Sequence, residues 1–410
     1  MSSSLIVPVA KVQKVREHPN ASLLCIAEIL GWKCVVPMRE NPDGEYVRVF
    51  VSGERDEKGK RIPIEEGNPQ KQETETIRFS PVHQEEDVVV YFPPDSMLPR
   101  EWAEKFGITG YLSFKKDDPD FGRIRCAKLR GEPSFGVVVA PPENVSWEVG
   151  DNVAEYYGAK KYEPPFRPNS GDMEAEHSSF PKYTDIENLR NFPDILSDGE
   201  EVVVTEKIHG SNFRSGIVEV GSEEDGQETF QTANGNSMMF VAGSHTHRRK
   251  IAESEEERKR NLYNMPLTIP AVEKLLLGLA EDADHQVILF GEVYGSKVQG
   301  GFNYDAGKGL GFRAFDLFID GKYLSYDEFK KICDEYGVET VPLIYRGPFD
   351  MQKIHSICNQ DGHSMIGQHM IEGGVVRPVV ERVHPAIGRV VLKYLADDYL
   401  VKNKTDFLDR

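Results

Sequence analysis

The sequence predicts an α+β fold in two parts, a small β-barrel domain followed by a domain that mixes strands with helices. The length of 410 residues suits two domains, and 39% hydrophobic residues are enough for a core in each. Short apolar runs separated by turn residues fill the first 160 residues. In the remainder, apolar strand patterns alternate with helical patterns.

The first domain is predicted to cover residues 1–160 and to consist mainly of strands. Four apolar runs of strand length lie at 5–9, 47–51, 88–92 and 136–139. An Asn-Pro-Asp-Gly turn signal lies at 41–44, between the first two runs. This spacing suits a small barrel, and an OB-like barrel is one candidate among several that periodicity does not separate. Residues 18–21, His-Pro-Asn-Ala, with the apolar run that follows, resemble the opening of tRNA-binding OB domains.

A polar stretch at 161–185, rich in Pro, Ser and Glu, predicts a linker or a loop. The second domain then covers 186–410 and is predicted to contain antiparallel sheets. Its strand candidates are apolar runs at 202–204, 287–290, 312–319, 374–376 and 390–392.

Two helices are predicted in the second domain. Ser325 and Glu328 have the spacing of a capping box, Phe329 and Cys333 fall on one face, and Gly337 can end the helix. The other helix is expected to start near Pro270 and carries a leucine-rich turn.

The charge balance excludes one way of binding nucleic acid. The net charge is −18, so a global basic field that coats nucleic acid without specificity is excluded. A local basic groove is still compatible with this net charge. Two clusters of Lys and Arg could form such a groove, or they could be ordinary solvated surface. They are Arg123, Arg125, Lys128 and Arg130, and Arg248, Arg249 and Lys250.

The sequence also limits where the protein acts. No apolar run approaches the roughly 18 residues of a membrane span, and the first residues lack a signal-peptide pattern. The five cysteines are scattered and form no CxxC, so neither a disulfide framework nor a zinc site is indicated. We therefore expect an intracellular, cytoplasmic protein with no membrane partner.

The segment that indicates chemistry is 206–212, Glu-Lys-Ile-His-Gly-Ser-Asn, directly after a Val-rich strand. A lysine that ends a buried strand before a glycine turn can be desolvated and aimed into a pocket. Since a free lysine has a pKa of about 10.4, burial is what makes its amine nucleophilic near pH 7. Taken alone, Lys207 is equally well a surface lysine that leaves a strand.

Further charged and aromatic residues follow on later strands, in a fixed order. Glu292 ends a second apolar strand, Phe315 lies on a third, Glu372 precedes two glycines, and Lys393 lies on the last strand. Together they supply a nucleophile, a cation for a phosphate, carboxylates for sugar and metal, and a flat surface for a base.

This ordered set, across about 200–400, resembles the covalent nucleotidyltransferase superfamily of polynucleotide ligases and mRNA-capping enzymes. Residues 206–212 are similar to motif I of the RNA ligase 2-like branch, with His209 where Asp is usual. The architecture resembles the RNA ligases of the Deinococcus and Naegleria type, which carry an OB domain before the nucleotidyltransferase domain. The resemblance implies an OB-like RNA-binding domain at 1–160 and a ligase-type adenylation domain at 186–410.

The resemblance also implies roles for individual residues. Lys207 would become adenylated, with Glu206 beside it at the cofactor, and His209 and Asn212 would act around the phosphates and the RNA ends. The other implied roles concern the bound nucleotide and metal: Glu292 binds the ribose, Phe315 stacks on adenine, Glu372 helps to hold Mg²⁺ or Mn²⁺, and Lys393 contacts the α-phosphate.

The sequence departs from the family pattern at two places. His245 follows the serine where the family has an arginine, so Arg248 is assigned to that motif and Arg249 is the fallback. Leu395 stands where the family often has a second lysine, which leaves open how the triphosphate is held.

The function that the resemblance implies is ATP-dependent joining of RNA ends through a lysyl-AMP intermediate. A DNA ligase or a capping guanylyltransferase is an alternative, but these enzymes place an OB domain after motif V, and 17 residues follow Lys393 here. A non-catalytic RNA-binding protein is the other alternative. The expected partners are ATP and RNA, either a nicked duplex or broken ends.

Overall fold

The computed structural model describes residues 5–57, 60–63, 74–115, 118–163, 172–220, 229–233, 235–295, 298–299, 302–359 and 363–403. The chain divides into two compact units, Ser4–Tyr162 and Glu163–Arg410. Among the described residues, no helix is long and apolar enough to cross a membrane.

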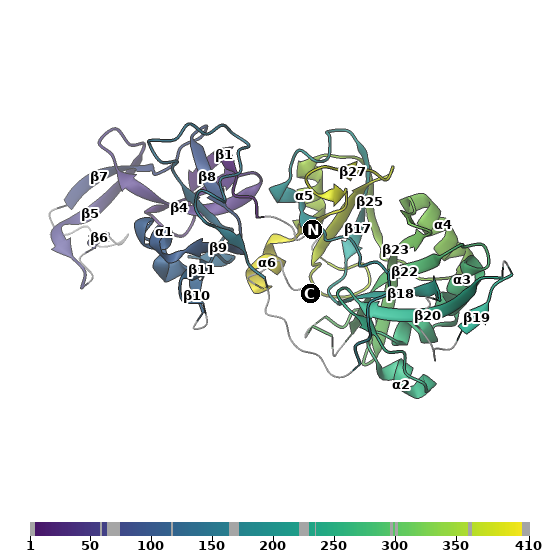
Figure 1. Cartoon of the computed structure of the whole chain (residues 1–410). Helices are drawn as coiled ribbons and strands as arrows, with labels where there is room; N and C mark the ends of the chain where they lie inside the picture. Colours follow the sequence, from purple (N-terminus) through teal and green to yellow (C-terminus); the bar gives the residue numbers. More distant parts are fainter. Residues whose placement is uncertain are drawn as a thin grey trace. The chain divides into compact units, whose positions relative to one another are not determined.

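The regular structure of the first unit consists mainly of short strands (Figure 1). Its one α-helix among the described residues is α1 (Arg100–Lys105). Its strands are β1 (Val9–Lys11), β2 (Lys14–Glu17), β3 (Leu24–Ile29), β4 (Trp32–Glu40), β5 (Tyr46–Arg55), β6 (Arg61–Pro63), β7 (Thr74–Pro81), β8 (Val88–Phe92), β9 (Ser96–Pro99), β10 (Ser113–Phe114), β11 (Phe121–Arg123), β12 (Ala127–Leu129), β13 (Glu132–Ser134), β14 (Val137–Val139) and β15 (Lys160–Lys161).

These strands form four antiparallel sheets. Their orders are β1-β8-β14, β10-β11-β9-β15, β12-β13 and β2-β3-β4-β7-β5-β6. The strands predicted at 47–51, 88–92 and 136–139 are confirmed as β5, β8 and β14. The strand predicted at 5–9 is placed too early, since β1 begins at Val9 and the Val7 N–H donates instead to Asn152 Oδ1 at 2.9 Å.

The second unit mixes strands and helices. The strands are β16 (Glu187–Asn188), β17 (Glu201–Lys207), β18 (Ser211–Glu219), β19 (Thr229–Gln231), β20 (Ser237–Ser244), β21 (Arg248–Arg249), β22 (Gln286–Gly295), β23 (Leu310–Ile319), β24 (Lys322–Tyr323), β25 (Leu343–Pro348), β26 (Gly373–Pro378), β27 (Val383–His384), β28 (Gly388–Arg389) and β29 (Leu392–Leu395). The helices are α2 (Glu255–Arg260), α3 (Pro270–Ala280), α4 (Tyr326–Tyr336), α5 (Met351–Asn359) and α6 (Asp397–Asn403).

Two large sheets organise this unit. One has the order β16-β29-β26-β17-β25, and the other has β19-β20-β18-β22-β23-β24 with β21 at the edge of β20. Among the described strands, every pairing is antiparallel except that of β16 with β29. The predicted α+β class with antiparallel sheets is therefore confirmed.

The predicted helices are also confirmed. Helix α4 begins after Ser325, whose side chain forms the capping box with Glu328, and it ends at Gly337 in the left-handed conformation, with φ 73°. Helix α3 begins at Pro270. The strand predicted at 390–392 starts later, as β29 at Leu392.

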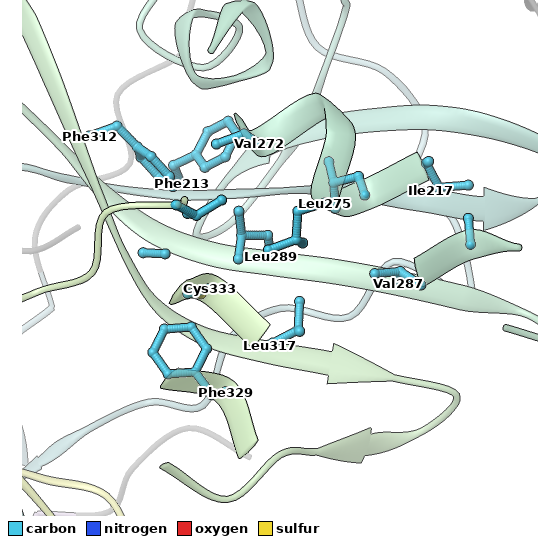
Figure 2. Packing of buried hydrophobic residues seen from close by; sticks show 14 of the residues in the cluster. Phe213, Ile217, Val272, Leu275, Val287, Leu289, Phe312, Leu317, Phe329 and Cys333 are labelled. Atoms are coloured by element: carbon cyan, nitrogen blue, oxygen red, sulfur yellow. The ribbon is translucent and has the colours of Figure 1, made fainter. Parts of the chain in front are cut away.

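The two helices cover one face of the seven-stranded sheet (Figure 2). Alternate residues of the sheet strands, including Phe213, Leu289 and Leu317, are fully buried there against Leu275 of α3 and Phe329 of α4. Successive residues of a strand point to opposite faces of the sheet, so the strand neighbours of these buried residues point to the other face. That opposite face carries the polar side chains described below.

All five cysteines are free and buried. Burial raises the pKa of Cys25 to about 11 and those of Cys333 and Cys358 to about 12. They are therefore packing residues, and none of them forms a disulfide in this structure.

Candidate active site

Lys207 ends the buried strand β17 and pairs with Glu372 at the start of the neighbouring strand. Its Nζ lies 2.8 Å from Glu372 Oε1, and the two side chains are 8% and 1% exposed. The backbone register opposes Lys207 to Gly373. A side chain at Gly373 would place its Cβ 2.0 Å from the Tyr394 carbonyl oxygen, so only glycine allows the strands to approach here. The sequence therefore brings an amine and a carboxylate together through strand pairing.

His209 is bound to the same carboxylate. Its Nδ1 lies 3.2 Å from Glu372 Oε2 and 3.0 Å from the Tyr399 hydroxyl, and all three side chains are buried. A carboxylate only accepts hydrogen bonds, so Nδ1 must carry the proton, and in a neutral ring Nε2 is then the acceptor nitrogen. The His209 backbone N–H donates to the Tyr304 hydroxyl at 2.6 Å. His209 is thus held by its backbone and by its ring.

Tyr304 and Tyr399 are site residues that the sequence did not reveal. Burial, with Glu372 nearby, raises the pKa of Tyr304, so its hydroxyl stays protonated. Phe302 packs edge-on against His209, with the ring centroids 4.6 Å apart. These aromatic residues come from the loop before β23 and from α6, where no local pattern predicts a contact with 206–212.

Tyr399→Phe removes only the hydroxyl that contacts His209 Nδ1. Since one hydrogen bond contributes about 0.5–1.5 kcal/mol to stability, we expect the free energy of unfolding to fall by about that amount. Free energies of unfolding of Tyr399→Phe, His209→Ala and the double variant form a double-mutant cycle. Full additivity of the two losses would show that Tyr399 does not act through His209.

Glu206 lies on the opposite face of the strand from Lys207. Its Oε2 accepts a hydrogen bond from the Met365 N–H at 2.8 Å, and burial raises its pKa. Alternation along β17 directs neighbouring side chains to opposite faces. The predicted contact between Glu206 and the cofactor stays a prediction, and the contact in this structure is with the 363–372 segment.

Lys393 lies on the same face as Lys207. Across the sheet, Thr205 opposes Val375 and Val375 opposes Lys393, and paired residues share a face. Lys393 is also largely buried. Leu395, at the position of the family's second lysine, is buried as an apolar side chain.

The second sheet contributes Asn212 and Glu292, which are opposed in the β18–β22 register. Gly210 lies against Glu292, since a Cβ there would be 3.0 Å from Glu292 Oε1. The Asn212 Oδ1 is buried and meets no hydrogen-bond donor among the described residues. An orphaned buried acceptor costs roughly 1–3 kcal/mol, so this atom is suited to a donor from a ligand.

Phe315 lies at an irregularity in the β22–β23 pairing. Phe290 opposes Asp316 and Gly291 opposes Ala314, so Phe315 is the extra residue between them. Such bulges re-aim side chains. The ring packs against the buried cluster that contains Ile208, the residue after Lys207, and it meets Tyr183 with ring centroids 4.9 Å apart.

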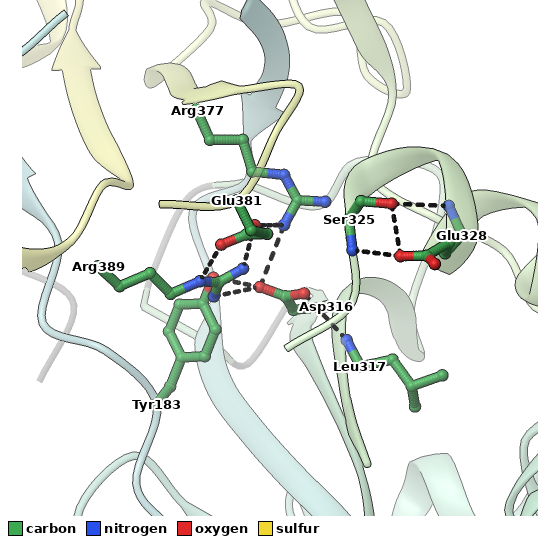
Figure 3. A network of polar contacts seen from close by, with 8 residues as sticks. All are labelled: Tyr183, Asp316, Leu317, Ser325, Glu328, Arg377, Glu381 and Arg389. Carbon is green, nitrogen blue, oxygen red and sulfur yellow. Dashed lines mark hydrogen bonds and ion pairs between the residues drawn. The ribbon is translucent and has the colours of Figure 1, made fainter. Parts of the chain in front are cut away.

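Asp316 anchors a buried polar network that joins the two sheets (Figure 3). Its Oδ2 lies 2.6 Å from Arg389 Nη1 and 3.2 Å from Arg377 Nη1, and it accepts a hydrogen bond from the Tyr183 hydroxyl at 2.9 Å. Burial, together with the Asp316 charge, raises the pKa of Tyr183, so the phenol remains a donor. Glu381 also pairs with both arginines.

Asp316→Asn is expected to lower the free energy of unfolding by about 3 kcal/mol, because two buried guanidinium groups lose a charged partner. Glu381 compensates in part, which places the loss at the lower end of the range for broken buried pairs. Equilibrium denaturation measures it. Asp327→Asn is the control, since its ion pair with Arg346 is exposed and should change stability by less than about 1 kcal/mol.

Three further arginines are covered by an acidic segment. Asp172 pairs with Arg249 and Glu174 with Arg248, at 2.7 and 3.2 Å. Glu176 pairs with Arg214 at 2.9 Å. Of the predicted linker at 161–185, residues 164–171 lie outside the described residues, and 172–180 pack on the second unit. The contact of Arg248 with the cofactor stays a prediction, because its partner here is Glu174.

The structure thus brings Lys207, His209 and Glu372 into contact, and places Lys393 on their face of the same sheet. Among the described residues, no group of three His, Cys, Asp or Glu side chains gathers in a way that could hold a metal ion. No role was predicted for Arg214 or Asp316 from the sequence. Both are charged residues inside an apolar strand run, and that pattern could have indicated them.

Comparison with known proteins supports a family for the second unit. Residues 200–395 match the family model described as RNA ligase, and this segment contains every predicted site residue. No curated protein matches the chain.

Solved structures of an RNA ligase from Naegleria gruberi resemble the whole chain. A mutant in the apo state has 21% identity and a TM-score of 0.63, over 97% of this chain and 98% of that one. Mutants with ATP and Mn and with AMP and Mn have 19% and 20% identity, each with a TM-score of 0.61 over the same shares of both chains. At this identity the likeness shows that the fold is shared.

Proposed function

We propose that this chain is an ATP-dependent RNA ligase, which joins a 3′-hydroxyl to a 5′-phosphate through AMP carried on Lys207. The observation that carries the proposal is the buried Lys207–Glu372 pair at 2.8 Å, inside the segment that matches the RNA ligase family model. The Naegleria structures with ATP, AMP and Mn support the same nucleotide and a divalent metal.

In the first step, Lys207 Nζ attacks the α-phosphorus of ATP. An N–P bond forms, the bond to the bridging oxygen breaks, and pyrophosphate leaves. A nucleophilic amine must be neutral, so Lys207 gives up a proton and its contact with Glu372 before it attacks. Lys393, on the same face, neutralises charge that develops on the α-phosphate.

The nucleotide is held by the second sheet. Glu292 accepts hydrogen bonds from the ribose hydroxyls, and Phe315 stacks on adenine. The orphaned Asn212 Oδ1 accepts from a ligand donor near the RNA ends. In this proposal, the sheet that contains Lys207 supplies the nucleophile, and the other sheet binds the nucleotide.

Glu372 is the residue that would hold Mg²⁺ or Mn²⁺. The described residues offer no complete ligand set, which fits an ion that keeps most of its water and takes one carboxylate. When bound, such an ion neutralises charge on the phosphates.

Two transfers follow adenylation. An oxygen of the RNA 5′-phosphate attacks the phosphorus of lysyl-AMP, the N–P bond breaks, and AMP becomes linked to the RNA end. The 3′-hydroxyl then attacks the 5′-phosphorus, a phosphodiester forms, and AMP leaves. His209, fixed by Glu372 and Tyr399, lies where it can order the phosphates during both transfers.

The first unit is proposed to be an OB-like domain that binds RNA, connected through 161–185. Its antiparallel sheets support this role, and so does the likeness to the Naegleria ligase, which extends over 97% of the chain.

The experiment that tests the function is incubation with α-labelled ATP or GTP and a divalent metal, followed by nicked RNA and DNA duplexes. We expect acid-stable labelling by ATP and sealing of RNA. Labelling by GTP would indicate a guanylyltransferase, preferred sealing of DNA would indicate a DNA ligase, and no labelling would indicate a non-catalytic RNA-binding protein.

A further inference from the structure

The four-stranded sheet of the first unit has the order β10-β11-β9-β15, and one of its faces packs into a hydrophobic core. Leu98, Ile124 and Phe114 belong to or pack on a buried cluster. Arg123 and Lys160 both oppose Met97 in the register, so they share the other face of the sheet.

Cations and aromatic rings alternate on this outer face. Lys160 Nζ lies 3.3 Å from the centroid of the Phe121 ring, and Arg123 Cζ lies 3.5 Å from that of Tyr162. Lys115 Nζ lies 4.9 Å from the same Tyr162 ring. Lys160 is exposed and the other four side chains are partly exposed. We call these five residues the cation–aromatic face.

Arg123 is fixed, whereas the two lysines can move. The Arg123 Nε donates to Asp95 Oδ1 at 2.6 Å, and Asp95 is 1% exposed, so the guanidinium plane that supports Tyr162 is rigid. Lys115 and Lys160 form no ion pair with a carboxylate among the described residues. Their ammonium groups lie at the ends of flexible side chains. Each ammonium group can therefore leave its aromatic ring for a phosphate when a base stacks on that ring.

The charge on this face is local. Residues 1–162 contain 22 Lys and Arg against 26 Asp and Glu, so the unit as a whole does not attract polyanions. A surface that binds RNA must therefore combine a few well-placed cations with contacts of another kind. Aromatic rings supply these, because every base has a face that can stack.

We propose that the cation–aromatic face binds a single-stranded part of the RNA substrate, with bases on Phe121 and Tyr162 and phosphates at Lys115 and Lys160. The inference rests on the proposed ligase function and names the surface that it uses. Single-stranded RNA fits because its bases can be splayed onto rings, whereas a duplex hides its base faces.

Two variants of the full chain test the surface. The double variant Lys115→Glu, Lys160→Glu should bind a fluorescent single-stranded RNA more weakly, and two lost phosphate contacts should flatten its slope of log K against log salt by about 1.4. Tyr162→Ala should weaken binding roughly 5- to 100-fold, and Tyr162→Phe should restore it. Labelling by α-labelled ATP should stay at the wild-type level in all of them.

Lys105→Glu is the matched control. Lys105 lies over Trp102 at 4.5 Å on α1, so it has the same kind of contact away from the cation–aromatic face. Equal loss in this control, unchanged RNA affinity in the test variants, or equal loss for a blunt duplex would overturn the proposal. Absent ATP labelling of the wild-type protein would instead overturn the ligase function.

Discussion

Lys207→Ala is expected to abolish labelling of the protein by α-labelled ATP. The amine is the only group of this residue that can form the N–P bond, and it is the amine that pairs with Glu372 in the buried site. Labelled protein on a denaturing gel, treated with acid, measures the loss. The same variant should still seal RNA whose 5′ end already carries AMP, because the last step needs no lysine nucleophile.

Lys207→Arg separates charge from nucleophilicity. Arginine keeps a cation near Glu372 and so preserves the local charge balance, but its guanidinium stays protonated at any working pH. We expect it to be as inactive in labelling as the alanine variant and closer to wild type in stability. Substantial labelling of either variant would place the nucleophile elsewhere.

Glu372→Gln is expected to lower the adenylation rate by about 100-fold or more. The amide has the size of the carboxylate but no charge, and a metal ion at the phosphates contributes several kcal/mol to the transition state. Lys207 and His209 also lose the anion that both of them contact. Rates of labelling over a range of Mn²⁺ concentrations measure the effect and reveal any weaker demand for metal.

The control for this variant is Glu201→Gln. Glu201 begins the same strand that Lys207 ends, and it forms an exposed ion pair with Arg346. Its replacement should leave adenylation within about twofold, since exposed ion pairs contribute little. Near-normal adenylation by Glu372→Gln would show that this carboxylate is not the metal ligand.

The sequence predicted those parts of the fold that depend on neighbours in the chain. Helix α4 begins at the capping box of Ser325 and ends at the left-handed Gly337, as expected, because both signals depend only on residues of one helix. The Val-rich strand before Lys207 and the glycines after Glu372 were equally readable. Once the two strands pair, the register opposes Lys207 to Gly373 and so brings it beside Glu372, the preceding residue.

The parts that could not be predicted depend on contacts between distant segments. Tyr399 meets His209 across 190 positions, and Arg389 meets Asp316 across 73. Neither contact has a period or a motif, since only the packed sheets determine which side chains meet. Glu206 lies next to Lys207 in the chain but on the opposite face of the strand, so its predicted contact with the cofactor stays a prediction.

The five buried cysteines make this chemistry independent of the thiol redox state around the protein. Oxidants and alkylating agents react with the thiolate, and the buried Cys25, Cys333 and Cys358, whose pKa values are raised, supply almost none of it near neutral pH. The proposed nucleophile is a lysine, which these oxidants leave untouched. The proposed RNA joining is therefore compatible with oxidative conditions that would silence an enzyme built on a reactive cysteine.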